Sequence, residues 1–241
     1  MQIFDIHPFD IDLEKFTSIQ SVLSERVVLR DTFTSKNIKL IAGVDVAYCN
    51  LKSSEYGICC IMVINVETMN VIEKAISAGK VTVPYIPGYL AFRELPLIIE
   101  AAKKLTCTPD LFMFDGNGIL HPRRMGIATH ASFFLNKPTI GIAKSYYKIE
   151  DVRFIPPINV NNSYEDIIFE NEVYGRALRT HKNVKPIFVS CGNYIDLSTA
   201  TEFTINLINR ESRLPIPVRL ADIETKRLTR LLVSQQSNLF L

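Results

Sequence analysis

The sequence of 241 residues lacks the features of several large classes of protein. It has no C-x-x-C pair, and its five cysteines are an odd number, which argues against a disulfide framework and a zinc site and indicates a reducing compartment. No apolar run is long enough to cross a bilayer, and the first residues include acids instead of a long apolar segment. We therefore expect a cytoplasmic protein that does not associate with membranes.

The chain also lacks a strong excess of charge and any visible boundary between domains. Its formal net charge of +2 is far from that of a protein held to nucleic acid by charge alone, so any site for a polyanion has to be a local patch. It contains no Ser/Gly linker, low-complexity tract or repeat. Because 47% of the residues are apolar, the chain can bury a sizeable core, and residues 1–241 are expected to form a single domain.

The hydrophobic pattern predicts strands near the start of the chain and alternating helices and strands after them. Apolar residues repeat with helical spacing over 12–29, and three strands over 38–48, 56–66 and 71–83 predict an antiparallel meander. The other expected helices are 91–105, 127–135, 198–209 and 221–235, the other strands are 111–114, 139–143, 172–180 and 185–190, and 151–165 is an expected loop. This order predicts an α/β fold, with a central mixed sheet flanked by helices.

The densest group of polar residues follows the short apolar run 111–114, which is typical of a buried strand. Asp115 comes at its end, and Gly-Asn-Gly-Ile-Leu-His-Pro-Arg-Arg follows. A carboxylate at a strand end, beside glycines that let the backbone approach a ligand, suits a metal site at a sheet edge. Taken alone, the segment is equally compatible with a Gly-rich turn that carries a solvated arginine pair.

Three further acids are candidates for the same site. Asp45 interrupts an apolar strand, where a carboxylate is costly unless it is paired or binds a cation, and its small neighbours favour a ligand over a buried arginine partner. Glu94 and Asp222 stand near predicted helix starts, where Glu94 on its own would be an ordinary N-terminal acid and the other interpretation of Asp222 is an N-cap. Carboxylates from separate elements together suit hard divalent cations, and two such ions roughly 3.5–4 Å apart serve phosphodiester hydrolysis.

Six segments of the chain carry a recognisable pattern: residues 41–48, 83–94, 115–130, 141–145, 186–192 and 213–222. The most specific are Tyr-Ile-Pro-Gly at 85–88 and Asp-Gly-x-Gly-x-x-His-Pro-Arg-Arg at 115–124. In sequence and in order, the six segments resemble those of the endonuclease V family, the deoxyinosine-directed repair nucleases. The resemblance implies a ribonuclease H-like fold. The chain departs from many members at Asn117 and Asn193, where they have histidine, which puts fine substrate preference in question but not the core ligands.

The resemblance implies a Mg²⁺ or Mn²⁺ site whose ligands are Asp45, Glu94, Asp115 and, at the position of the family's last ligand, Asp222. It implies that Lys144 lies near the scissile phosphate and His121 beside the metal site, so both join the first three acids as catalytic candidates. On its own, Lys144 is also compatible with an ordinary surface lysine, which its position at a strand end disfavours.

Three groups of residues are expected to contact DNA. By resemblance, a wedge that enters the duplex consists of Tyr85, Ile86, Pro87 and Gly88. A buried loop anchor is the other interpretation of that segment, but prolines on both sides of Tyr85-Ile86 favour a stiff, exposed tip. By resemblance, the pocket for the flipped base is lined by Leu90, Gly116, Ile127 and Gly141. The candidates for holding the DNA backbone are Arg123, Arg124 and Lys148.

The predicted function is that of a metal-dependent deoxyribonuclease V, a DNA repair endonuclease that recognises deoxyinosine (hypoxanthine) by base flipping. By resemblance, it hydrolyses the second phosphodiester bond 3′ to the lesion and leaves 3′-hydroxyl and 5′-phosphate ends. The expected partner is DNA containing deoxyinosine, with inosine-containing RNA as an alternative, and a monomer is expected. Competing interpretations are an inosine-specific endoribonuclease, another ribonuclease H-like structure-specific nuclease, a lesion-binding protein without catalysis and a small-molecule phosphohydrolase.

Overall fold

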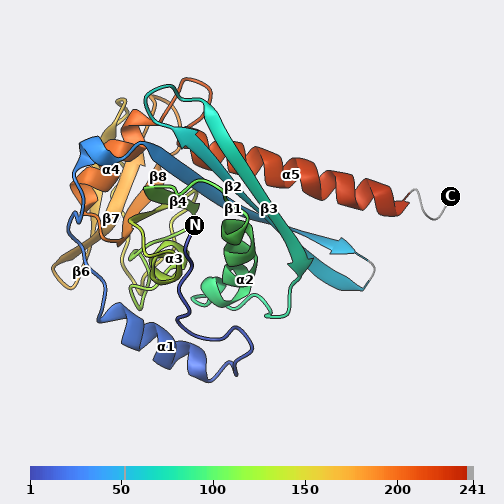
Figure 1. The fold of residues 1–241 in the computed structure, drawn as a ribbon. Coiled ribbons are helices and arrows are strands. Elements are labelled where there is room, and N and C mark those ends of the chain that lie inside the picture. The colour runs from blue at the N-terminus through green and yellow to red at the C-terminus, as the bar shows by residue number, and fades with distance from the viewer. Residues whose placement is uncertain (52, 238–241) are drawn as a thin grey trace.

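Eight strands form one sheet at the centre of the computed structural model, which describes residues 1–51 and 53–237 (Figure 1). The strands lie in the order β3-β2-β1-β4-β5-β8-β7-β6. Their bounds are β1 Leu40–Leu51, β2 Ser54–Asn65, β3 Val71–Lys80, β4 Leu111–Asp115, β5 Thr139–Ala143, β6 Ser163–Phe169, β7 Glu172–Arg179 and β8 Ile187–Asn193.

The sheet is mixed, with parallel pairs only at its centre. β1, β2 and β3 form an antiparallel meander, and β5, β8, β7 and β6 also pair antiparallel. Between these two parts, β4 runs parallel to both β1 and β5. Because β4 and β5 are buried on both faces, their sequences are nearly continuous apolar runs. β1, β4 and β5 run in the same direction, and β4 and β5 end at the same side of the sheet, whereas β1 continues beyond them to Leu51.

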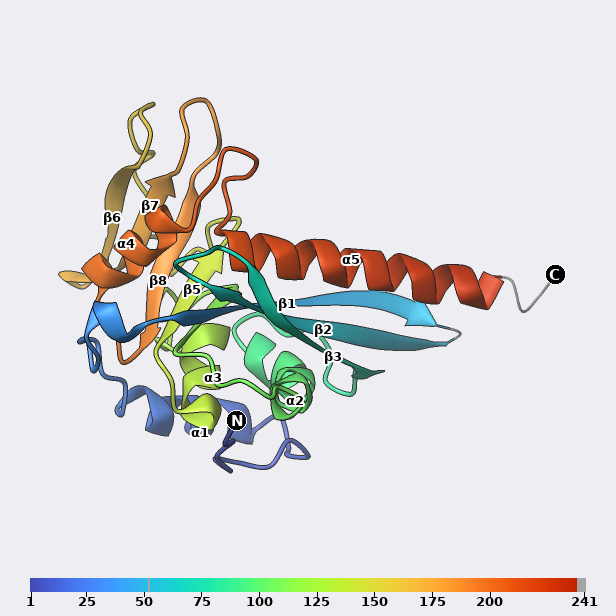
Figure 2. The ribbon, with the colours of Figure 1, turned by 45° about the horizontal axis from the view of Figure 1, so that its top comes forward.

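Helices cover both faces of the sheet (Figure 2). Their bounds are α1 Lys15–Ser24, α2 Leu90–Lys103, α3 Ile127–Leu135, α4 Leu197–Asn206 and α5 Ile216–Ser237, with a short 3₁₀ turn at Ser35–Asn37. α2 and α3 pack on one face, in a core that includes Ala42 and Val44, whereas α4 and α5 share the core of the other face with Ile41. α1 lies outside α2, where the rings of Phe16 and Phe92 stack with centroids 3.8 Å apart.

α5 packs against β1 at unusually short range. A Cβ atom at Gly43 would lie 2.1 Å from the carbonyl carbon of Pro217, so only glycine allows this contact. Farther along α5, Ala221 packs against Cys60 and Met62 of β2. This contact sets the position of α5 across the sheet and, with it, the positions of the polar side chains that follow Ala221.

The predicted α/β fold with a mixed sheet, an N-terminal meander and flanking helices is confirmed. The bounds predicted for α3 and β5 match those observed. β6 was not predicted: the expected loop 151–165 covers its first residues and the others were left unassigned, since this edge strand has an exposed face and no continuous apolar run. The helix predicted over 12–29 is shorter, at Lys15–Ser24. Among the described residues, no helix has the length and apolarity that a membrane span requires.

The last helix begins five residues earlier than predicted, at Ile216 instead of Ala221. The prolines at 215 and 217 suggest a loop, but a proline in the first turn of a helix breaks no intrahelical hydrogen bond. Asp222 consequently lies inside α5, and the interpretation of this residue as a helix N-cap is wrong.

Candidate active site

The parallel strands bring the first two candidate acids and the candidate lysine to one place. Val44 pairs with Phe114, so Asp45 and Asp115 occupy neighbouring positions at the ends of the paired segments of β1 and β4. Asp115 in turn pairs with Ile142 of β5, and Lys144 follows directly after that strand. Ligands of open α/β sheets commonly bind outside the carboxyl ends of parallel strands; Asp115 and Lys144 stand at such ends, and Asp45 stands where the pairing of β1 with β4 ends, although β1 itself continues to Leu51.

α5 adds the third acid to this group. Asp45, Asp115 and Asp222 each offer a carboxylate oxygen, and these oxygens all lie within 4.8 Å of one another. Lys144 forms ion pairs with both Asp115 and Asp222, and Lys226 lies 2.8 Å from the other oxygen of Asp222. The three carboxylates therefore face a common point, with two ammonium groups beside them.

Glu94 approaches the same region from α2 but is not a member of the group of three. It is buried, and its Oε1 accepts a hydrogen bond of 2.7 Å from the hydroxyl of Tyr48 on β1. Arg93, the preceding residue, points elsewhere, since it donates to the carbonyl of Val83 at 2.7 Å and pairs with Glu55 at 2.6 Å. Glu94 is thus held beside the cluster by a phenol instead of an arginine.

The charges in the site are not balanced, and the pKa values reflect this. Burial, followed by the hydrogen bond and charge of Asp115, raises the pKa of Asp45 to about 7. Burial also raises the pKa of Glu94 to about 8. The pKa of Lys144 is raised as well, because the attraction of Asp115 and Asp222 outweighs burial. A site in which two acids hold protons near neutral pH is short of positive charge.

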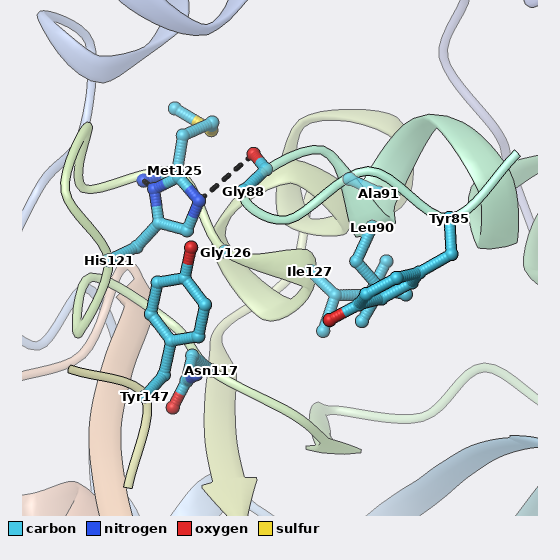
Figure 3. A pocket seen from close by; sticks show the side chains of 10 residues that line it. All are labelled: Tyr85, Gly88, Leu90, Ala91, Asn117, His121, Met125, Gly126, Ile127 and Tyr147. Carbon is cyan, nitrogen blue, oxygen red and sulfur yellow. Dashed lines mark hydrogen bonds between the residues drawn. The ribbon is translucent and has the colours of Figure 1, made fainter. Parts of the chain in front are cut away.

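A pocket of about 400 Å³, including its open mouth, is lined in part by Asn117, which follows Asp115 in the turn after β4 (Figure 3). Tyr85, Leu90 and Ile127 form one wall, and His121 and Tyr147 stand on the opposite side. The remaining lining residues are Gly88, Ala91, Asn117, Met125 and Gly126. The pocket is mostly apolar with a few polar groups, which is the usual composition of a site for an organic ring.

Two glycines predicted for this pocket lie behind its wall. A Cβ atom at Gly141 would stand 2.2 Å from the backbone nitrogen of Gly118, so this glycine lets β5 pack against the turn that carries the lining residue Asn117. Gly116 has a φ of +153°, and a Cβ there would meet Ile127 at 2.6 Å. Both residues shape the pocket through the backbone, whereas Leu90 and Ile127 line it directly.

His121 lies in the pocket wall with both ring nitrogens engaged. Its Nε2 donates to the carbonyl of Gly88 at 3.0 Å, and its Nδ1 accepts from the backbone nitrogen of Arg123 at 3.1 Å. The ring stacks on Tyr147 with centroids 5.9 Å apart. Burial lowers the pKa of His121 to about 4, so the ring is neutral at pH 7. This arrangement holds the turn in shape and leaves no free nitrogen for a metal.

The Tyr-Ile-Pro-Gly segment forms the rim of the pocket between β3 and α2. Tyr85 is 63% exposed, and Pro87 is exposed as well. Gly88 has a φ of +84°, a backbone conformation that favours glycine, and its carbonyl points toward His121 (Figure 3). The tip is thus open to solvent while its last residue is anchored to the turn after β4.

The three basic residues expected to bind phosphate already have partners in the chain. Arg123 donates to Gln20 at 2.6 Å and to the Gly88 carbonyl at 2.9 Å. Arg124 pairs with Glu172, and the largely exposed Lys148 lies 2.9 Å from Asp151. In an exposed ion pair such as Lys148–Asp151, a phosphate can replace the carboxylate at little cost in free energy. The contacts of Arg123, in contrast, are partly buried.

The comparison with known proteins identifies the family. A family model described as Endonuclease V matches residues 21–223. The chain belongs to the endonuclease V family. Endonuclease V from Bacillus thuringiensis subsp. konkukian (strain 97-27) is 62% identical over 221 residues, which cover 92% of this chain and 94% of the relative. The protein is accordingly an endonuclease, a hydrolase that acts on DNA, with the DNA-binding and repair role of this family.

Solved structures of endonuclease V share the fold. The crystal structure from Bacillus subtilis has a TM-score of 0.95 and 56% identity, and covers 98% of this chain and 100% of that one. Endonuclease V from Ciona intestinalis, solved in complex with a 24mer DNA containing an inosine followed by a ribo-adenosine, has a TM-score of 0.80 and 29% identity, covering 91% and 98%. The sheet and helices of this chain are therefore of the ribonuclease H-like class.

Several residues of this endonuclease V site were not singled out from the sequence. Thr225 donates a hydrogen bond to Asp45, Tyr48 holds Glu94, and Tyr147 lines the pocket. Gln20 is fully buried on α1 and contacts the Tyr-Ile-Pro-Gly rim. Only Gln20 had a signal in the sequence, because it is a polar residue on the apolar stripe between Phe16 and Leu23. Of the two family departures, Asn117 lines the pocket and Asn193 is buried, accepting from Val28.

Proposed function

We propose that this endonuclease V recognises deoxyinosine flipped out of DNA and hydrolyses the second phosphodiester bond on its 3′ side, in a reaction that depends on Mg²⁺ or Mn²⁺. The observation that carries this proposal is the convergence of three carboxylates next to a ring-sized pocket. One segment serves both sites, since Asp115 belongs to the carboxylates and Asn117 to the pocket. A base held in the pocket would therefore place its own strand beside the acids.

The donor set of the carboxylate cluster fits a hard divalent cation. Asp45, Asp115 and Asp222 supply oxygens only, which Mg²⁺ and Mn²⁺ prefer, and Glu94 stands near enough for the charges of Asp45 and Asp115 to add to the effect of burial in raising its pKa. We propose these four acids as the residues that hold the metal. Bound there, the cation supplies a water of lowered pKa and stabilises charge on the phosphate oxygens.

The remaining side chains have roles that their contacts support. Lys144 carries its ammonium between Asp115 and Asp222, from where it neutralises charge on a phosphate placed over the cluster. The tip of exposed Tyr85, half-buried Ile86 and exposed Pro87 suits a wedge that fills the gap left by the flipped base. Flipping costs a few kcal/mol, and less for a mismatched base, so a deoxyinosine pair is opened more easily than a regular pair.

The pocket supports selection of hypoxanthine over adenine. Its polar groups are few, and a base whose edge presents a donor to a buried donor leaves both groups without a hydrogen-bond partner. Discrimination then comes from the cost of unpaired polar groups instead of from shape alone.

The decisive experiment uses a labelled duplex with one deoxyinosine, incubated with and without Mg²⁺. We expect a single cut at the second bond on the 3′ side, with a 3′-hydroxyl and a 5′-phosphate, and no cut after chelation. Asp115→Ala should bind the duplex without cutting it. Cleavage that persists in EDTA, or an equal rate on a duplex with adenine in place of hypoxanthine, would refute the proposal.

An inosine-directed ribonuclease is the second candidate. The observation in its favour is that the Ciona intestinalis relative was solved with an inosine followed by a ribo-adenosine. The same experiment with inosine in RNA, and with one ribonucleotide 3′ to deoxyinosine, decides between the two. A much faster cut in RNA than in DNA would make RNA the main substrate.

A further inference from the structure

We propose that Gln20 on α1 is a positioning residue for the Tyr-Ile-Pro-Gly rim, acting through Arg123 and the carbonyl of Gly88. The inference rests on the proposed function, because the rim matters only if it enters the duplex. It assigns a task in the reaction to a helix that carries none of the acids and none of the pocket residues.

Gln20 is an anomaly in its helix. It lies one turn after Phe16 and one turn before Leu23, on the face of α1 that packs inward, and its relative exposure is 0%. A buried amide without hydrogen bonds costs free energy, whereas an apolar residue here would cost nothing. A glutamine at this position is therefore expected to make specific contacts.

Those contacts all go to the Tyr-Ile-Pro-Gly rim and to the turn after β4. The Nε2 of Gln20 donates to the carbonyl of Gly88 at 3.0 Å and to the carbonyl of Met125 at 3.3 Å. Its Oε1 accepts a hydrogen bond of 2.6 Å from Nε of Arg123. One side chain thus ties the rim to the turn after β4, across 68 and 105 residues of sequence.

Arg123 completes the same arrangement. Its Nη2 donates to the Gly88 carbonyl at 2.9 Å, and its guanidinium lies over the ring of Tyr89 at 4.3 Å. The hydroxyl of Tyr89 contacts Thr17 of α1 at 2.6 Å. Because Gln20, Arg123 and His121 all donate to one carbonyl, Gly88 is the best-anchored point of the rim. The geometry makes Arg123 part of this anchor and not a free phosphate ligand.

The other end of the rim is held separately. Arg93 is buried, donates to the carbonyl of Val83 at 2.7 Å and pairs with Glu55 at 2.6 Å. Residues 84–87, between these two anchors, accept no hydrogen bond from either arginine among the described residues. Loss of the Gln20 contacts would remove one of the three donors to the Gly88 carbonyl and leave Arg123 without its partner on α1, so the Gly88 end would loosen while the Val83 end stays fixed. A misplacement of about 1 Å at a reacting assembly can cost roughly 100-fold in rate.

The test uses Gln20→Met, which keeps the length of the side chain and removes its polar atoms. The chain has no tryptophan, so Tyr85→Trp places a single fluorescent reporter at the tip of the rim. We expect Gln20→Met to lower the fluorescence anisotropy of this reporter and to make it more accessible to acrylamide. Leu207→Ala is the control, since it removes a buried side chain on the opposite face of the sheet and lowers stability without touching the rim.

Cleavage is then compared between a duplex and a single strand that carry the same deoxyinosine. We expect Gln20→Met to cut the duplex roughly 10- to 100-fold more slowly at saturating enzyme. The single strand has no paired base to displace, so its cleavage should change little. Leu207→Ala, assayed well below its melting temperature, should slow neither substrate.

Two results would overturn the inference. One is an unchanged anisotropy of the Tyr85→Trp reporter in Gln20→Met. The other is an equal loss on the duplex and on the single strand, which indicates general damage to the protein. If the wild-type protein cuts neither deoxyinosine substrate, the proposed function is wrong, and the reporter still shows whether Gln20 holds the rim.

Discussion

The hydroxyl of Tyr48 donates a hydrogen bond of 2.7 Å to Oε1 of Glu94, across the boundary between β1 and α2. The bond favours the ionised form of Glu94, whose pKa is nevertheless raised to about 8 by burial. The burial and charge of this pair also raise the pKa of Tyr48, so the phenol keeps its proton. Tyr48 is therefore a permanent donor to an acid that would otherwise be still harder to ionise.

Tyr48→Phe removes this donor without changing the size of the ring. We expect the pKa of Glu94 to rise further and the cleavage rate at pH 7 to fall, with partial recovery as the pH is raised. A hydrogen bond to a charged group contributes about 1.5–3 kcal/mol, so the loss should be roughly 10- to 100-fold. The measurement is a single-turnover pH–rate profile in saturating Mg²⁺. Tyr164→Phe, on the distant edge strand β6, is the control, and an unshifted profile for Tyr48→Phe would contradict the prediction.

Metal binding should release protons near neutral pH. The pKa values of Asp45 and Glu94 are raised to about 7 and about 8, so these two acids bind more protons in the metal-free folded protein than in the unfolded chain between about pH 4 and 8. Their contribution to the stability of the folded protein should therefore decrease as the pH rises through this range. A cation requires the ionised acids, so the increase in melting temperature that Mg²⁺ produces should be larger at pH 8 than at pH 6.

Calorimetric titration with Mg²⁺ in two buffers of different ionisation enthalpy measures the released protons directly. At a free concentration 100 times the dissociation constant, the stabilisation is about 2.7 kcal/mol. Asp115→Asn is the matched variant and should lose most of the response, since it removes both a ligand and the charge that raises the pKa of Asp45. An equal Mg²⁺ effect at both pH values argues against protonated ligands.

Lys144→Met should separate metal affinity from catalysis. The ammonium of Lys144 pairs with Asp115 and Asp222, so a cation at the cluster competes with it for the same oxygens. Without it, Mg²⁺ should bind more tightly, while cleavage falls by roughly 100-fold or more because charge on the phosphate is no longer neutralised. Thermal shift against Mg²⁺ and single-turnover cleavage measure the two effects. Lys148→Met, at an exposed pair, is the control, and weaker Mg²⁺ binding by Lys144→Met would be inconsistent with this competition.

Gly43→Ala should displace α5. The added methyl group would lie 2.1 Å from the backbone of Pro217, which cannot yield without moving the helix that carries Asp222 and Thr225. We expect a loss of about 1–3 kcal/mol in the free energy of unfolding, together with weaker Mg²⁺ binding. Gly79→Ala is the matched control, because its methyl group would meet only one side-chain atom of Leu97, at 3.3 Å. Urea denaturation of both variants tests the prediction, and similar values for the two would disprove it.

The elements that were predicted best are those whose own residues determine them. The bounds of α3 and β5 follow from short apolar segments closed by Asn136 and by the polar residues after Ala143, and both match the structure. β6 could not be found in this way, because its pairing with β7 and not its own pattern makes it a strand. The start of α5 was missed because its prolines are compatible with both a turn and a first helical turn.

In the candidate site, too, the sequence indicates the residue types, whereas only the structure shows their contacts. The residue types at Asp45, Asp115 and Asp222 indicate a common site, since acids in or beside apolar segments need a partner, and the structure brings their oxygens together. The sequence cannot show that Lys144 bridges two of them, that Glu94 depends on Tyr48, or that His121 uses both ring nitrogens for the backbone.

What the sequence by itself determined is the chemistry: oxygen ligands, an apolar rim loop, and a mixed sheet flanked by helices. What only the tertiary structure decided is which group faces which, because the contacts of Lys144, of Tyr48 with Glu94 and of His121 with Gly88 join residues tens of positions apart. Such contacts depend on strand register and on how closely helices dock, as at Gly43 beneath α5 and at Gln20 against Gly88. No local sequence pattern encodes the close approach of α5 to Gly43 or of Gln20 to Gly88, since both contacts result from the packing of the whole sheet and its helices.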